Sequence, residues 1–164
     1  MTNSEYLQRL VDQMYEIDGC RELDEYGTKI FGRPIKGSWI LFRYLTRVAV
    51  PEVWMWFPDK EYASYPPDHI PVPSYETFAT FMLHEVTHGW CYFHKERDQF
   101  HYPTGVDEEQ VCWDVSALVS KMLGIEYDEA EASQSHQFHK LCQAGDLDGL
   151  GKLMPKMAAH HQLP

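Results

Sequence analysis

The feature that most constrains this chain is a His-Glu-x-x-His motif, formed by His84, Glu85 and His88. Residues four apart on a helix lie on the same face, so both imidazoles can reach one metal ion. Glu85 projects beside them, where a carboxylate can hold and deprotonate a water molecule at the metal. The pattern also occurs by chance, so the alternative is two accidental core or surface histidines.

A catalytic zinc site usually has three protein ligands, and a third candidate lies on a second expected helix. Glu108 and Glu109 both begin an apolar segment that ends at Gly124. Glu109 is the first choice for the third ligand and Glu108 the second. The alternative is that Asp107, Glu108 and Glu109 only complement the positive end of the helix dipole. The two roles are compatible with each other.

Composition predicts one globular domain over residues 1–164, with 44% hydrophobic residues and a net charge of −11. This charge argues against binding to nucleic acid or to an anionic membrane surface. No apolar run reaches membrane-spanning length, and the N-terminus lacks the features of a signal peptide. We therefore expect a soluble protein of the cytoplasm.

Other potential metal ligands are expected to be structural. Cys91 and Cys112 each follow a candidate ligand by three residues, and we expect both to pack the two site helices as reduced thiols. A histidine pair at residues 136 and 139 has no nearby acidic partner and is also interpreted as structural. His160 and His161 are expected in a frayed tail.

The N-terminal third (residues 1–58) is expected to contain a helix that stops near Gly19, then a loop region with Gly27 and Gly32 that reaches Ser38. Strands are expected within residues 47–57, which are rich in β-branched and aromatic side chains.

The middle third (residues 59–125) is expected to contain an edge strand near Ile70 and Val72, ahead of the two site helices. An extended peptide substrate could pair with such an edge, although a proline-rich connector fits the local sequence equally well. In the loop between the site helices, His101 and Tyr102 are candidates for stabilising an oxyanion above the metal, against an ordinary surface role. Residues 126–164 are expected to form C-terminal helices.

Several segments together resemble a known family: residues 67–73, 78–90, 108–111 and 123–125. They are similar to the metallopeptidase domain of the ArdC antirestriction family, which also occurs in phage polyvalent proteins. That family has an Asp-x-Ile-x-Met-Pro edge, a Leu-His-Glu-Leu-x-His-Trp helix, a Glu-Glu-Leu-Val-Ala-Glu helix and a closing Leu-Gly-Ile. The resemblance covers about residues 60–160.

The resemblance implies that His84, His88 and Glu109 are the metal ligands and that Glu85 is the catalytic glutamate. The chain departs from the family where Trp113 stands in place of an acidic residue, with Asp114 one position later. It also has no room for the family's separate single-stranded-DNA-binding domain, so DNA binding does not follow.

These observations predict an α+β, zincin-like metallopeptidase fold with a small mixed sheet, two metal-site helices and C-terminal helices. The predicted function is zinc-dependent hydrolysis of peptide bonds in a protein substrate. The resemblance implies a phage or mobile-element setting, with a host defence or regulatory protein as target. The main alternative is a non-catalytic, zinc-stabilised binding module that inhibits or decoys a host protein. A purely acidic DNA mimic is a third hypothesis, which the many aromatic residues disfavour.

Overall fold

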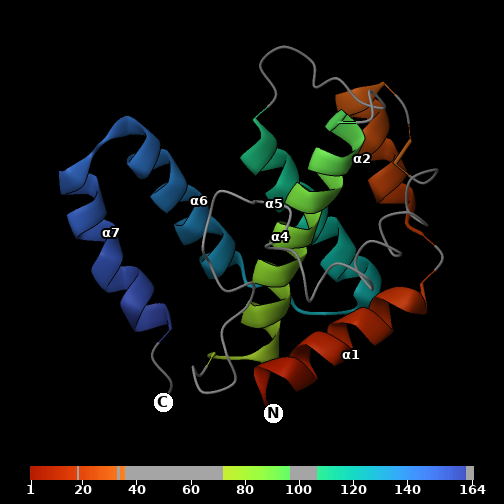
Figure 1. The fold of residues 1–164 in the computed structure, drawn as a ribbon, viewed down its shortest axis with the longest axis horizontal. Coiled ribbons are helices and arrows are strands. Elements are labelled where there is room, and N and C mark those ends of the chain that lie inside the picture. The colour runs from red at the N-terminus through yellow and green to blue at the C-terminus, as the bar shows by residue number, and fades with distance from the viewer. Residues whose placement is uncertain (18, 33, 36–71, 97–106, 162–164) are drawn as a thin grey trace.

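The computed structural model describes residues 1–17, 19–32, 34–35, 72–96 and 107–161. Every regular element in these ranges is a helix (Figure 1). The helices are α1 (Asn3–Tyr15), α2 (Arg21–Phe31), α4 (Tyr75–Glu96), α5 (Glu108–Leu123), α6 (Glu129–Ala144) and α7 (Leu147–His160).

The prediction of an α+β fold with a mixed sheet is wrong, because the described core is built by helices packed on helices. The strands expected within residues 47–57 lie outside the described residues, as does Ile70 at the expected edge strand. Val72 is described: its backbone is irregular, and its half-buried side chain packs against the helical core. Short apolar runs do not distinguish a strand from other buried segments, and the prolines beside Val72 remove the donors that a sheet ladder needs.

Helix α4 forms the centre of the fold, with α5 packed along it and with α1 and α6 also in contact with it (Figure 1). Phe78 and Met82 are almost fully buried on one side of the helix, and Thr80, Thr87 and Cys91 are fully buried on the opposite side. A helix that is buried around most of its circumference belongs to the interior of the protein. Although α4 has 22 residues, no helix in the described ranges is long and apolar enough to cross a membrane.

The N-terminal helix is confirmed, and it is held by local and tertiary contacts. The Thr2 side chain caps the helix, and Glu5 completes a capping box by binding back to the Thr2 backbone. Leu10 and Met14 on the same face are fully buried and belong to the cluster that includes α4. Amphipathic spacing in the sequence therefore placed this helix correctly.

Helix α2 replaces the loop expected around Gly27, and the glycine pattern explains the error. Gly27 lies buried inside the helix, whereas Gly32 ends it with a left-handed φ of 71°. An internal glycine costs about 1 kcal/mol relative to alanine, so it argues against a helix in an isolated sequence. Packing against α5 stabilises this one, with Leu23 almost fully buried.

The remaining helices begin and end at residues that the sequence makes recognisable. Asp107, Asp128 and Asp146 are the N-caps of α5, α6 and α7, and each side chain accepts a hydrogen bond from a backbone N–H of the first turn. Gly124 ends α5 with a φ of 65°, as predicted. The C-terminal helices are confirmed, and they form an antiparallel pair in which α7 packs on α6 (Figure 1).

A pair of leucine substitutions tests this core. Leu10 is 0% exposed and Leu147 is 79% exposed, so the two residues differ mainly in burial. Leu10→Ala should lower the free energy of unfolding by about 2–5 kcal/mol, because it removes buried methyl groups and leaves a cavity. Leu147→Ala should change it by less than about 0.5 kcal/mol. Urea unfolding followed by circular dichroism measures both values, and equal losses would contradict the proposed packing.

Candidate metal centre

The contact between α4 and α5 brings the three predicted ligands together. The Nε2 atoms of His84 and His88 lie 3.0 Å apart, on successive turns of α4. From α5, the Glu109 carboxylate approaches both: Oε1 lies 2.9 Å from Nε2 of His88, and Oε2 lies 3.3 Å from Nε2 of His84. The motif helix is confirmed, and the three side chains converge on one point from two helices.

The spacing of these donor atoms fits a tetrahedral zinc ion. Zinc bonds of about 2.0–2.1 Å at tetrahedral angles place neighbouring donor atoms about 3.3 Å apart. The three separations are 3.0, 2.9 and 3.3 Å, so an ion would need only a small outward shift of the side chains. Two imidazoles and one carboxylate also leave a fourth coordination position without a protein ligand, which is typical of catalytic zinc.

Glu108 contacts the other nitrogen of His88, and this contact separates the roles of the two adjacent glutamates. Oε1 of Glu108 lies 3.1 Å from Nδ1 of His88, on the side of the ring away from Glu109. A proton on Nδ1 that is donated to Glu108 leaves the lone pair of Nε2 directed at the convergence point. The geometry therefore favours Glu109 as the third ligand and gives Glu108 the role of orienting His88.

His84 is held neutral and fixed in orientation by its surroundings. Its ring stacks on the indole of Trp113 from α5, with centroids 3.6 Å apart and planes 18° apart. The residue is 5% exposed, and burial lowers the pKa of His84 to about 4. The imidazole is therefore unprotonated near neutral pH, as a metal ligand must be. Within the described part of the chain, Nδ1 of His84 has no hydrogen-bond partner.

His88 is the proton-binding member of the group in the absence of metal. Burial lowers its pKa, but the Glu108 and Glu109 carboxylates outweigh burial and raise the pKa of His88 to about 10. Burial raises the pKa of Glu109, yet its contacts with the two histidines bring the net value below its usual range. The site thus has a carboxylate-rich environment that favours positive charge, which a divalent cation could supply in place of a proton.

Glu85 lies beside this group without being one of the converging ligands. It is partly exposed, and its negative charge contributes to the raised pKa of His88. Its role as a general base, predicted from the motif, stays a prediction.

Asp114 does not contact the converging ligands. Its carboxylate accepts hydrogen bonds from Tyr26 Oη at 3.0 Å and from Gln110 Nε2 at 2.8 Å. Asp114 therefore fastens α2 to α5, and burial beside this carboxylate raises the pKa of Tyr26 well above its usual range. The sequence left the acidic partner of a ligand in doubt, and in the structure Glu108 takes this position beside His88. The adjacent acidic residues at the start of α5 were the sequence signal for it.

The two cysteines of this region are confirmed as buried residues of the α4–α5 interface. Cys91 and Cys112 are both 0% exposed. The Cys112 sulfur lies within 4.8 Å of donor atoms of His88 and Glu108, so it was a possible ligand. Burial raises the pKa of Cys112 well above its usual value, which disfavours the thiolate that metal binding requires.

Four other predicted site residues have different outcomes. His101, Tyr102 and Ile70 lie outside the described residues, and Val72 packs against the core. His136, expected to be structural, has its Nε2 3.6 Å from Oδ2 of Asp107, which is too long for a hydrogen bond.

A scan of protein-family models and searches of curated proteins and of solved structures found no match to this chain. We therefore infer function from the geometry of the site and from the sequence motifs.

Substitutions at the two adjacent glutamates test their separate roles. Glu109→Ala should weaken zinc retention more than any change at Glu108, because it removes a donor atom. Glu108→Ala should weaken retention about 10–100-fold, because His88 loses the partner of its Nδ1. Glu108→Gln keeps an amide oxygen as acceptor and should retain most of the affinity. Competition with a chromogenic chelator measures all three, and a stronger effect at Glu108 than at Glu109 would reverse the assignment.

Proposed function

We propose that this protein is a zinc-dependent metallopeptidase that hydrolyses peptide bonds in a protein substrate. The observation that carries the proposal is the convergence of His84 Nε2, His88 Nε2 and the Glu109 carboxylate, with the Glu108 carboxylate 3.1 Å from Nδ1 of His88. Two neutral imidazoles and one carboxylate leave a bound Zn²⁺ with a net charge of +1. A site of this kind keeps Lewis acidity, whereas additional anionic ligands would reduce it.

Zinc at this position would supply Lewis-acid chemistry, which makes water acidic enough to act as a nucleophile near neutral pH. Glu85 then has two tasks. Its carboxylate takes a proton from the water as the hydroxyl oxygen adds to the scissile carbonyl carbon. It delivers that proton to the leaving nitrogen as the C–N bond breaks, so the products are a carboxylic acid and an amine.

The surrounding residues keep the ligands in place during this reaction. Trp113 covers one face of His84, and Glu108 holds the outer nitrogen of His88, so neither ring can rotate without losing a contact. The ligands are largely buried, which strengthens electrostatic interactions within the site. Preorganisation of this type is a major source of enzymatic rate enhancement.

The biological setting that we propose rests on the sequence resemblance. The His-Glu-x-x-His helix and the Glu-Glu helix are similar to the ArdC metallopeptidase domain, which suggests a phage or mobile-element protein acting in the host cytoplasm. The target would be a host defence or regulatory protein. A zinc-stabilised binding module is the competing function, and Glu85 argues against it, because a structural site needs no general base.

Variants at Glu85 and His84 separate these two functions. Glu85→Gln keeps the size of the side chain and removes its basicity, so zinc content and thermal stability should stay unchanged. The rate of peptide cleavage in a host-cell lysate, measured by mass spectrometry, should fall about 10²–10⁴-fold. Proton transfer by a positioned side chain contributes a rate factor of this size. His84→Ala should instead lower zinc content, stability and cleavage together.

The contrary result is specific. Neither zinc-loaded wild-type protein nor Glu85→Gln protein would cleave peptides. The biological effect would then be retained in Glu85→Gln and lost in His84→Ala. That pair of results would identify a zinc-stabilised binder.

A further inference from the structure

A second group of histidines and carboxylates lies where the end of α7 returns to the start of α6. Figure 1 shows the antiparallel course of the two helices, which brings the last turn of α7 back beside the first turn of α6. His160 is the last residue of α7 and His161 is its C-cap. Asp128 is the N-cap of α6, and Glu131 lies in its first turn. The expectation of a frayed tail is therefore wrong for both histidines.

The donor atoms of this group converge on one carboxylate oxygen. Nε2 of His161 contacts Oε2 of Glu131, and Nε2 of His160 lies 4.0 Å from the same oxygen. Nε2 of His160 also lies 2.9 Å from Oδ2 of Asp128. One donor atom each from Glu131, His160 and His161 lies within 4.8 Å of the others, a spacing that a single metal ion can bridge.

The burial of Glu131 makes charge compensation necessary at this point. The residue is 5% exposed, and a buried carboxylate is costly unless it is paired. Ser135 donates a hydrogen bond of 2.9 Å to Oε1, which leaves Oε2 for the two histidines. Asp128 adds a second carboxylate, which accepts a hydrogen bond from Thr77 and lies 2.9 Å from Nε2 of His160. Two carboxylates that face two imidazoles form a group whose charge a divalent cation can balance.

We propose that Glu131, His160 and His161 form a second zinc site, with Asp128 beside it. Two imidazole nitrogens and one carboxylate oxygen are a donor set that suits Zn²⁺ better than Mg²⁺ or Ca²⁺, which prefer oxygen ligands. No His-Glu-x-x-His motif supplies a general base here, so the role that we assign to this site is structural. The inference does not depend on the proposed peptidase function.

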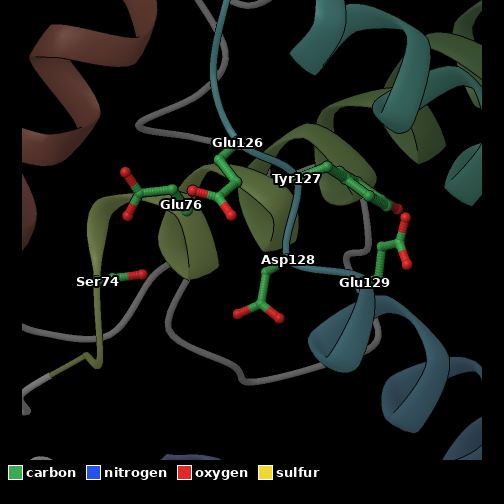
Figure 2. Close-up of a pocket in the computed structure, with 6 residues that line it drawn as sticks. All are labelled: Ser74, Glu76, Glu126, Tyr127, Asp128 and Glu129. Carbon is green, nitrogen blue, oxygen red and sulfur yellow. The ribbon is translucent and has the colours of Figure 1, made fainter.

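The neighbouring surface favours a cation here. A pocket of about 680 Å³ adjoins Asp128 and is lined by residues from the start of α4 and from the segment that leads into α6 (Figure 2). Besides Asp128, three carboxylates line it, those of Glu76, Glu126 and Glu129. A concave surface lined by charges of one sign raises the local concentration of ions of the opposite sign.

The site would fasten the C-terminal helix pair to the central helix. Thr77 of α4 donates a hydrogen bond to Oδ2 of Asp128, and the Asp128 backbone N–H donates to Oγ1 of Thr80 at 3.0 Å. Asp128 thus connects α4 to α6. His160 connects α7 to Asp128, and His161 connects α7 to Glu131 of α6. Helix α7 has one buried residue, Leu153, so apolar packing alone holds it weakly. Zinc bound here would therefore stabilise the docking of α7.

Zinc stoichiometry of full-length protein tests the proposal, with Zn²⁺ itself as the probe. Native mass spectrometry after equilibration with Zn²⁺ should count two ions per chain in the wild type and one in a His160→Ala, His161→Ala double variant. His139→Ala is the matched control, since it removes a histidine of α6 outside the group, and it should keep two. In His84→Ala protein, zinc bound at the second site should still raise the melting temperature. Adding the double substitution to His84→Ala protein should abolish this zinc-dependent rise.

His161→Ala alone guards against misfolding of the double variant. The His161 side chain is 48% exposed, so its removal should leave the fold intact while weakening the second ion at least about 10-fold. Equal zinc content and affinity in the wild type, the double variant and His161→Ala would overturn the proposal. If only His84→Ala lowered the zinc content, the α4–α5 centre would be the one zinc site. If only the double variant lowered it, the second site would be the one zinc site, and this result would count against the peptidase.

Discussion

The packing of α5 along α4 is the interaction on which the rest of the structure depends. Buried side chains of α4 such as Met82 and Leu83 lie in one core with Val115 and Val119 of α5. This apolar contact fixes the two helices, and it therefore sets the position of Glu109 relative to the histidines of α4. A polar site that needs tolerances of well under 1 Å is thus held by side chains that take no part in its chemistry.

Charge compensation inside this apolar frame is the second constraint. At the α4–α5 centre, burial keeps His84 neutral, while Glu108 and Glu109 raise the pKa of His88. At the end of α7, the buried Glu131 faces two histidines in a similar way. In both places imidazole nitrogens face carboxylate oxygens across a helix contact, and a divalent cation can replace protons as the source of positive charge.

Local sequence was sufficient wherever local physics decides the structure. The spacing of His84 and His88 places both on one face of a helix in any context, because the period of the helix is fixed. N-caps such as Asp107 and the left-handed glycine at residue 124 define helix ends through hydrogen bonds within one turn. From the sequence, Glu109 could be preferred to Glu108 as the third ligand, but local patterns do not decide between two adjacent glutamates. The overall class was wrong, since short apolar runs around Val72 carry no periodicity that separates a strand from other buried backbone.

The sequence by itself determined the motif helix, the end of α5 at Gly124 and the candidate ligands His84, His88 and Glu109. Only the tertiary structure decided which of these residues meet. Glu108 and Glu109 are neighbours in the chain, yet the packing of α5 on α4 places Glu108 at Nδ1 of His88 and Glu109 at Nε2 of the same ring. Glu131 and His160 are separated by a whole helix pair, and the hairpin of α6 and α7 brings them together. Contacts between distant segments depend on how helices pack, and no local periodicity encodes that packing.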